Sequence, residues 1–153
     1  MIRFTNVPQF KAVLKAHPLY LKNVLRDVLV EVSIVTFESI VKGNQFGNPK
    51  GTPVQTGFAR SSWYVESGPP TLQTMPRPAK GQWDKSGGGS LSAGTAVIVT
   101  SASLGVPLHF VNGAEYAVIL EYGGSERQAP HGMVRLATAN AQAILDSVVR
   151  RLK

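Results

Sequence analysis

Apolar positions between residues 18 and 42 recur every three or four residues, which predicts one long α-helix. Pro18 suits the first turn of this helix, where its missing N–H needs no acceptor. The apolar surface is wider than one stripe, so the helix needs two partners: its own sheet and, as the second candidate, a neighbouring subunit. The main stripe consists of Leu21, Val24, Leu25, Val28, Val32, Val35 and Ser39.

Three further helices are predicted by similar spacing. Residues 6–16 form a short one, with Asn6 as a possible cap and Pro8 in its first turn. Residues 114–122 form another, ended by a glycine pair. The last runs from Pro130 to the C-terminus, where its closing basic residues face the negative end of the helix dipole.

Strands are predicted between these helices. Residues 61–67 form one around Trp63 and Val65, and residues 96–101 form a second, rich in β-branched side chains. Residues 106–111 form a third, which Pro107 places at an edge or a strand start. Helices on both sides of a group of strands predict a single α+β domain over residues 1–153, an antiparallel sheet packed by the long N-terminal and the C-terminal helix.

Residues 68–94 form the segment with the fewest apolar anchors. Four prolines and a run of three glycines predict a long, flexible loop or arm inserted between strands, which orders when it binds something. The candidate contact residues of this arm are its apolar and basic side chains: Leu72, Met75, Arg77, Lys80, Trp83 and Lys85.

Charge and composition limit the function classes. The net charge is +7, and residues 1–60 hold eight Lys and Arg against three Asp and Glu. This balance suits contact with duplex DNA through its phosphates, but no basic recognition helix or basic run predicts base readout. No apolar run approaches the ~20 residues of a membrane span, and no signal peptide is expected at the N-terminus.

Catalytic and metal-binding patterns are missing from the sequence. The absence of cysteine excludes disulfides and thiol chemistry, and fits a reducing compartment. His17, His109 and His131 stand far apart, and His109 is best interpreted as an ordinary strand residue. Gly87-Gly88-Gly89-Ser90 lacks the Gly-Lys-Ser/Thr ending of a phosphate loop. We therefore expect no enzyme activity, cofactor or metal.

One segment has the composition of a structured turn: Thr52-Pro53-Val54-Gln55-Thr56-Gly57. Pro53 restricts the backbone, and Gly57 can adopt a conformation closed to other residues. Thr56 can cap the helical turn predicted at residues 58–61. Arg60 would then lie beside the first strand, ready to pair with a carboxylate, for which Glu121 is the candidate.

Two stretches together resemble the neck or tail-completion family of tailed bacteriophages. The first is Thr52-Pro53-Val54-Gln55-Thr56-Gly57-Phe58-Ala59-Arg60-Ser61-Ser62-Trp63, similar to a "TPVDTG-x-LR-x-S" turn. The second combines residues 111–123 with residues 128–133, similar to an "N-x-x-x-YA-x-x-x-E-x-G" helix followed by a "P-x-x-M/F" helix entry. The resemblance covers roughly residues 18–66 and 95–153. Gln55 stands where the family usually has Asp, and Phe58-Ala59 replaces a more usual Arg-Leu.

This resemblance implies a structural virion protein that is assembled in the bacterial cytoplasm. The subunit would join a ring of its own copies, sixfold by resemblance, at the top of the tail. Its partners would be the tail terminator and head-connector proteins, with genomic duplex DNA passing through the lumen without sequence readout. The ring would complete the tail and let it join the DNA-filled head.

Two questions stay open at the level of sequence. The predicted subunit-interface residues also suit plain core packing: Tyr116, Leu120, Glu121, Tyr122 and Met133. The basic composition also suits a small DNA-binding accessory protein, which steeply salt-dependent binding to free DNA would favour.

Overall fold

The fold combines helices with a small sheet. It is described by a computed structural model, which defines residues 17–71, 83–123, 129 and 131–152. The helix predicted at residues 6–16 lies outside this part. The elements in chain order are α2 (Pro18–Val41), α3 (Phe58–Ser61), β1 (Trp63–Ser67), α4 (Gly88–Ser101), β2 (Leu108–Asn112), α5 (Ala117–Glu121), α6 (Val134–Ala139) and α7 (Ala141–Arg151).

The sheet has two antiparallel strands within the described residues. Trp63 pairs with Asn112 and Ser67 with Leu108. The mixed α+β class is therefore confirmed, and the predicted strands at 61–67 and 106–111 exist with slightly shifted bounds. The strand predicted at residues 96–101 does not exist.

Residues 96–101 are helical, so the strand predicted there is wrong. They form the second half of α4, which packs along β1 and α2. Gly94 permits this packing, because a Cβ on it would lie 2.3 Å from Cε1 of Phe37. Ile98, the centre of the expected strand, is fully buried. Tertiary contacts outweigh the strand preference of these β-branched residues.

Both ends of α4 are held by side chains from outside the helix. At its start, Asp84 accepts hydrogen bonds from the backbone N–H of Gly89 at 2.9 Å and of Ser86 at 2.8 Å. At its end, Arg26 of α2 donates to the carbonyl oxygens of Ala102 at 3.2 Å and Val99 at 3.0 Å. These bonds satisfy helix-end groups that would otherwise be left to water.

The last part of the predicted arm at 68–94, residues 83–94, does not form a flexible loop. Residues 83–87 form the turn that starts α4, and residues 88–94 are its first turns. Leu72, Met75, Arg77 and Lys80 lie outside the described residues. The flexible-arm prediction is thus wrong for 83–94.

The predicted C-terminal helix is divided into α6 and α7 at Asn140. The side-chain amide of Asn140 donates to the carbonyl oxygens of Gly47 at 3.1 Å and Leu136 at 3.0 Å. This contact ties the break to the loop after α2.

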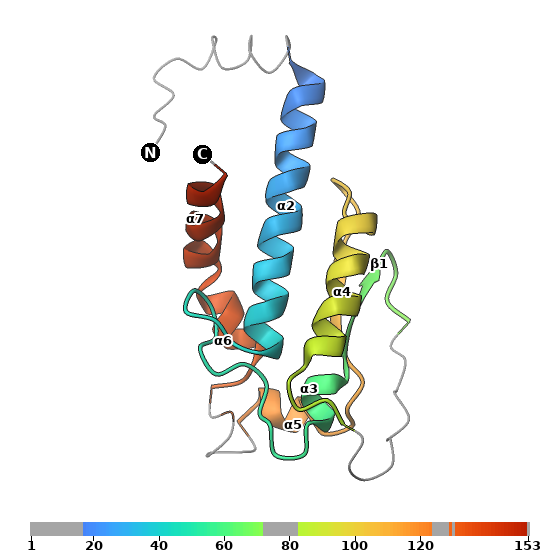
Figure 1. The fold of residues 1–153 in the computed structure, drawn as a ribbon, viewed down its shortest axis with the longest axis vertical. Coiled ribbons are helices and arrows are strands. Elements are labelled where there is room, and N and C mark those ends of the chain that lie inside the picture. Colours follow the sequence, from blue (N-terminus) through green and yellow to red (C-terminus); the bar gives the residue numbers. More distant parts are fainter. Residues whose placement is uncertain (1–16, 72–82, 124–128, 130, 153) are drawn as a thin grey trace.

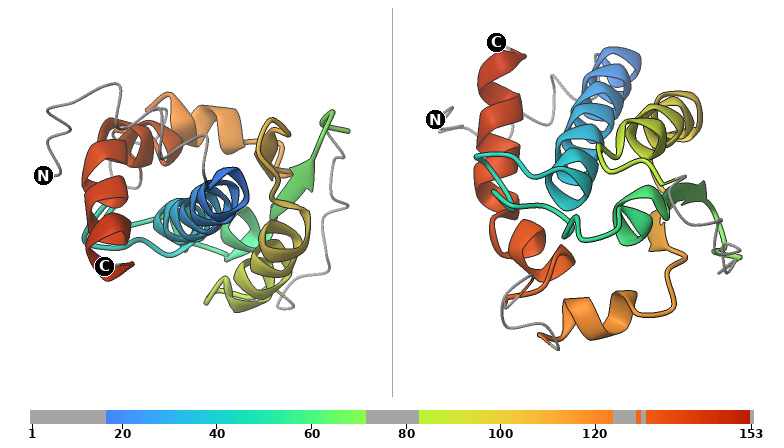
Figure 2. Two further views of the ribbon diagram at one scale, coloured as in Figure 1. Left: turned by 90° about the horizontal axis from the view of Figure 1, so that it is seen from above. Right: turned by 60° about the horizontal axis from the view of Figure 1, so that its bottom comes forward.

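The helix α2 is the centre of the molecule. It lies between α7 on one side and α4 on the other, as Figures 1 and 2 show. Its second half is buried, whereas its first turns project beyond the ends of α4 and α7 (Figure 1). Among the described residues, no helix combines the length and apolarity needed to cross a membrane.

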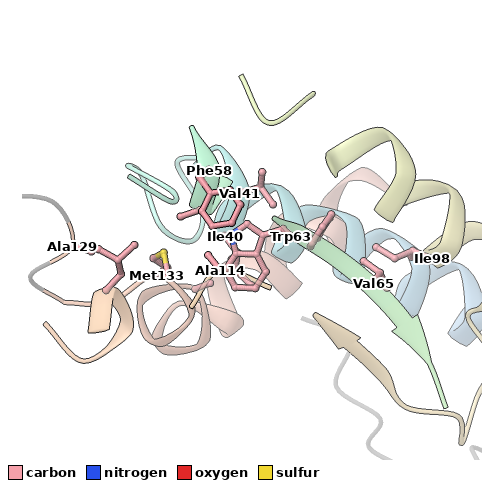
Figure 3. Packing of buried hydrophobic residues seen from close by; sticks show 13 residues of the cluster. Ile40, Val41, Phe58, Trp63, Val65, Ile98, Ala114, Ala129 and Met133 are labelled. Carbon is pink, nitrogen blue, oxygen red and sulfur yellow. The ribbon is translucent and has the colours of Figure 1, made fainter. Parts of the chain in front are cut away.

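The core fills the space where α2, α3, α4 and β1 meet. Figure 3 shows Ile40, Val41, Phe58 and Trp63 gathered there, with Val65 and Ile98 farther along the strand. The same cluster extends to Met133 and Ala129 near the start of α6. A smaller cluster of Val35, Ile144 and Val148 joins α2 to α7.

Candidate functional site

The two stretches that carry the family resemblance lie beside each other in the structure. The turn at residues 52–57 and the helix α5 line one pocket of about 280 Å³. Its lining residues are Pro53, Gln55, Thr56, Gly57, Ala59, Tyr116 and Leu120. We refer to residues 52–60 together with residues 116–122 as the turn–helix site.

Thr52 anchors the turn to the core. Its buried hydroxyl donates to the carbonyl oxygen of Ile40 at 2.8 Å and accepts from Nε1 of Trp63 at 2.8 Å. Its backbone N–H donates to the carbonyl oxygen of Val41 at 3.2 Å. A buried indole N–H needs a partner, so this threonine satisfies α2 and β1 at once.

Gly57 ends the turn in the left-handed region, with φ at 87°. A Cβ at this position would also lie 2.9 Å from Cγ of Lys85. The conformation and the close approach both require glycine. Thr56 accepts the N–H of Phe58 at 3.3 Å, but Gly57 is the N-cap residue of α3 and no side chain caps this helix, so the predicted cap is not formed. Pro53 lines the pocket beside Tyr116, and Val54 is exposed.

Arg60 does not pair with Glu121, and that prediction is wrong. Its guanidinium instead donates to the carbonyl oxygen of Thr52, at 2.9 Å from Nε and 2.6 Å from Nη2. Burial lowers the pKa of Arg60, and the nearby carboxylate of Asp84 partly opposes this effect. Arg60 therefore clamps the start of the turn, at Thr52, to the helix α3.

Trp83 and Lys85, predicted as arm residues, lie against this turn. The ring of Trp83 is 5.3 Å from that of Phe58, which is 6.1 Å from that of Tyr116. Three aromatic rings thus connect the segment before α4 with α3 and with the start of α5. Each ring pair of this kind contributes ~0.5–1.5 kcal/mol to stability. The sequence signal for this contact was the lone tryptophan in a polar segment.

Glu121 caps the helix α6. Its carboxylate accepts the backbone N–H groups of Met133 and Val134, both at 2.8 Å, and of Arg135 at 2.9 Å. The guanidinium of Arg135 lies 3.5 Å from the same carboxylate and 5.4 Å from the ring of Tyr122. These contacts hold the end of α5 against the start of α6.

The predicted interface residues differ widely in exposure. Leu120 and Met133 lie in the core of the fold, and Tyr116 packs on Phe58, so the structure gives these three a packing role. Tyr122 is 74% exposed. Val118 and Ile119, which were not among the predicted interface residues, are exposed beside it. The sequence signal for this exposure is that the short helix α5 has apolar side chains on more than one side, and one side of so short a helix is enough to pack on the core.

A second group of exposed apolar side chains lies on the projecting start of α2. Leu19 is 71% and Leu25 is 55% exposed, and Tyr20 and Val24 are exposed as well. Figure 1 places this group at the opposite end of the molecule from α5.

Histidine and carboxylate side chains are spread over the described part of the chain. No three His, Asp or Glu side chains there come together as a metal site. His109 lies in β2 opposite Glu66, whose pKa is lowered mainly by hydrogen bonds from Thr71. Asp84, whose pKa is lowered to about 2 by bonds from Ser86 and Gly89, is used as a helix cap.

Comparison of the chain with protein-family models, with curated proteins and with solved structures gives no match. The site must therefore be interpreted from its own geometry.

Proposed function

We propose that this chain is a structural subunit of the neck of a tailed bacteriophage, part of a ring that completes the tail for joining to the DNA-filled head. The supporting observation is the pair of exposed apolar surfaces at opposite ends of the fold, on α5 and on α2. A twofold dimer uses one patch on both subunits, whereas rings and stacked assemblies use two different patches.

The assignment to a phage neck rests on the resemblance of the turn–helix site to the family motifs. The turn, the helix and the helix entry form one unit here, joined through Thr52, the aromatic rings and Glu121. Such a unit holds α5 rigidly while its outer side stays exposed. A rigid, exposed, apolar helix is suited to subunit contact.

The partners in this proposal are further copies of the chain, the tail terminator and the head connector, with DNA in the lumen. The proposed role is assembly rather than catalysis, within the virion. The net charge of +7 suits passing DNA, because phosphate attraction without base readout permits sliding.

The test is the particle mass of the purified protein over a range of concentrations, by light scattering, with and without duplex DNA. We expect particles several times the subunit mass of 16.4 kDa. A double change, Val118→Glu with Ile119→Glu, should return them to monomers, while Glu115→Gln in the neighbouring loop should not.

Other results would overturn the proposal. A wild-type protein that stays monomeric at every concentration would contradict self-assembly into a ring. A monomer that also binds DNA tightly at physiological salt would favour the DNA-binding accessory protein, which the basic composition supports.

A further inference from the structure

The strand β2 has one edge that no described strand pairs with. At one end of its ladder with β1, Gly68 donates to the carbonyl oxygen of Pro107 at 3.0 Å, and at the other end Gly113 donates to that of Ser62 at 3.0 Å. In an antiparallel ladder, alternate residues point their backbone groups toward the paired strand, and the residues between them point theirs away. These two hydrogen bonds therefore determine which residues of β2 point their N–H and C=O groups outward. They are Leu108, Phe110 and Asn112.

The residues of this edge line an open groove of about 510 Å³. All five residues of β2 are half-buried and line the groove, to which α5 contributes Val118, Glu121 and Tyr122. Among the described residues, none forms a backbone hydrogen bond with the outward groups of β2. Unpaired backbone groups along a strand edge are a template for pairing, and proteins often protect such edges with charged side chains. Residues 108–112 contain no Lys, Arg, Asp or Glu, so this edge lacks that protection.

A second copy of β2 matches this edge in antiparallel orientation. The three outward residues are spaced symmetrically about Phe110, so Phe110 would pair with its own copy and Leu108 with Asn112 of the second copy. Each outward N–H then meets an outward carbonyl oxygen. The side-chain amide of Asn112 already donates to the carbonyl oxygen of Ala59 at 2.8 Å, so no unsatisfied amide would face the leucine.

The charges on the outer face of the sheet also suit this pairing. His109 lies opposite Glu66 of β1, and on its other side it would lie opposite Val111 of the second copy. No two like charges therefore face each other across the contact, where they would be destabilising. The self-complementary spacing and the absence of opposed like charges both favour a second copy as the occupant of this edge.

We propose that two copies of this chain pair through β2, so that their two-stranded sheets join into one four-stranded antiparallel sheet with twofold symmetry. Backbone hydrogen bonds between the two edges provide the affinity, and Phe110 of each copy packs against the other. Val118 and Tyr122 line the same groove, so the pairing covers part of the α5 surface that the proposed ring uses. The dimer must therefore open before α5 enters a ring. This last step rests on the proposed function; the pairing itself does not.

Cysteine cross-linking tests the pairing, because the natural chain contains no cysteine. In the proposed dimer, position 109 of one copy and position 111 of the other form a non-hydrogen-bonded pair, whose Cα atoms are ~4.5 Å apart and within reach of a disulfide. Two single variants, His109→Cys and Val111→Cys, are mixed and oxidised, and the linked dimer is followed by non-reducing electrophoresis. The matched control is Tyr64→Cys mixed with Glu66→Cys, because these half-buried positions lie directly opposite on β1, away from the proposed contact.

We expect the mixed β2 variants to cross-link about tenfold faster than either β2 variant alone or the mixed β1 variants, because only the first mixture holds two thiols opposite each other. Equal rates in all samples would overturn the pairing. Faster cross-linking of the β1 mixture would also overturn it, and would assign the contact to the edge of β1. Circular dichroism of the reduced variants checks that they are folded.

A second pair of variants tests the outward backbone groups without cysteine. Leu108→Pro and Leu108→Ala both remove the same half-buried side chain, but only proline removes the outward N–H. Because this N–H points away from β1, the ladder between β1 and β2 keeps its hydrogen bonds in both variants. Sedimentation measures the dissociation constant of the dimer, which we expect to be at least tenfold weaker in the proline variant. Equal constants, or a wild-type protein without a two-subunit species, would overturn the pairing.

Particle mass separates this pairing from the proposed ring. If the proline variant loses the two-subunit species and still forms larger particles, both proposals are supported. If larger particles form while the β2 mixture does not cross-link faster than its controls, the pairing fails and the ring stands. If the linked β2 dimer forms and no larger particle appears at any concentration of wild-type protein, the pairing stands and the ring fails.

Discussion

The two halves of α2 have similar apolar content but opposite environments. Residues 33–41 are enclosed by α4, α6 and α7, and even Ser39 is fully buried there, accepting the N–H of Asn48. In residues 18–27, by contrast, Leu19 and Tyr20 are among the most exposed large hydrophobic side chains of the described structure. Burial along this helix thus follows the length of its neighbours rather than its own hydrophobicity. The buried half stabilises the fold, and the projecting half is available for contacts.

The largest expected effect distinguishes these two halves directly. Phe37→Ala should lower the free energy of unfolding by ~3–5 kcal/mol, because it leaves a cavity under Gly94 and beside Phe110. Leu25→Ala should cost ~1 kcal/mol or less, as expected for an exposed position. Urea denaturation measures both. Equal losses would show that the projecting half is as firmly packed as the core.

A second test compares the buried and the exposed threonine of the turn. Thr52→Val removes the acceptor of the Trp63 indole and should cost ~1–3 kcal/mol, because a buried N–H loses its partner. Thr56→Val, on the exposed side of the turn, should change the free energy of unfolding by less than ~0.5 kcal/mol. If both variants are equally stable, Thr52 is not the anchor of the turn.

A third test concerns the attachment of α5 to α6. Glu121→Ala removes the carboxylate that accepts three backbone N–H groups and should cost ~1 kcal/mol, the usual loss for a helix cap. Glu115→Ala, in the exposed loop before α5, is the matched control. Faster hydrogen exchange at Val134 and Arg135 in the first variant alone would support the cap, and unchanged exchange there would contradict it.

The smallest expected effect is the acid response of the α4 start. The pKa of Asp84 is lowered to about 2 by its hydrogen bonds, from an ordinary value of 3.8, so its carboxylate favours the folded state. This stability is fully present above about pH 4 and is lost as the pH falls toward 2. An NMR titration of the Gly89 amide should show a midpoint near 2. Asp84→Asn should abolish that transition, and a midpoint near 4 would contradict the cap.

Much of the fold could be predicted from local signals. The long helix was predicted nearly to the residue, because Pro18 marks its start and the glycine-rich loop after Lys42 marks its end. The turn at residues 52–57 was also predicted from the sequence, because proline and glycine determine the backbone conformation locally. Of the site, the turn residues were predicted from the sequence, but the partner of Arg60 and the contact of Glu121 with the start of α6 were not.

The α4 helix shows why the rest could not be predicted. Its start lies in a glycine-rich segment and its end in a run of β-branched residues, so local preference alone indicates loop and strand. Only the folded chain brings Asp84 to its first turn, Arg26 to its last turn and Phe37 against Gly94.

The sequence by itself thus determined where the backbone must turn and which long segment is helical, because proline, glycine and apolar period act through neighbouring residues. The tertiary structure alone decided that residues 88–101 are a helix, that Glu121 caps α6, and that only half of α2 is buried. These outcomes depend on hydrogen bonds and packing between residues far apart in the chain, which no local pattern specifies.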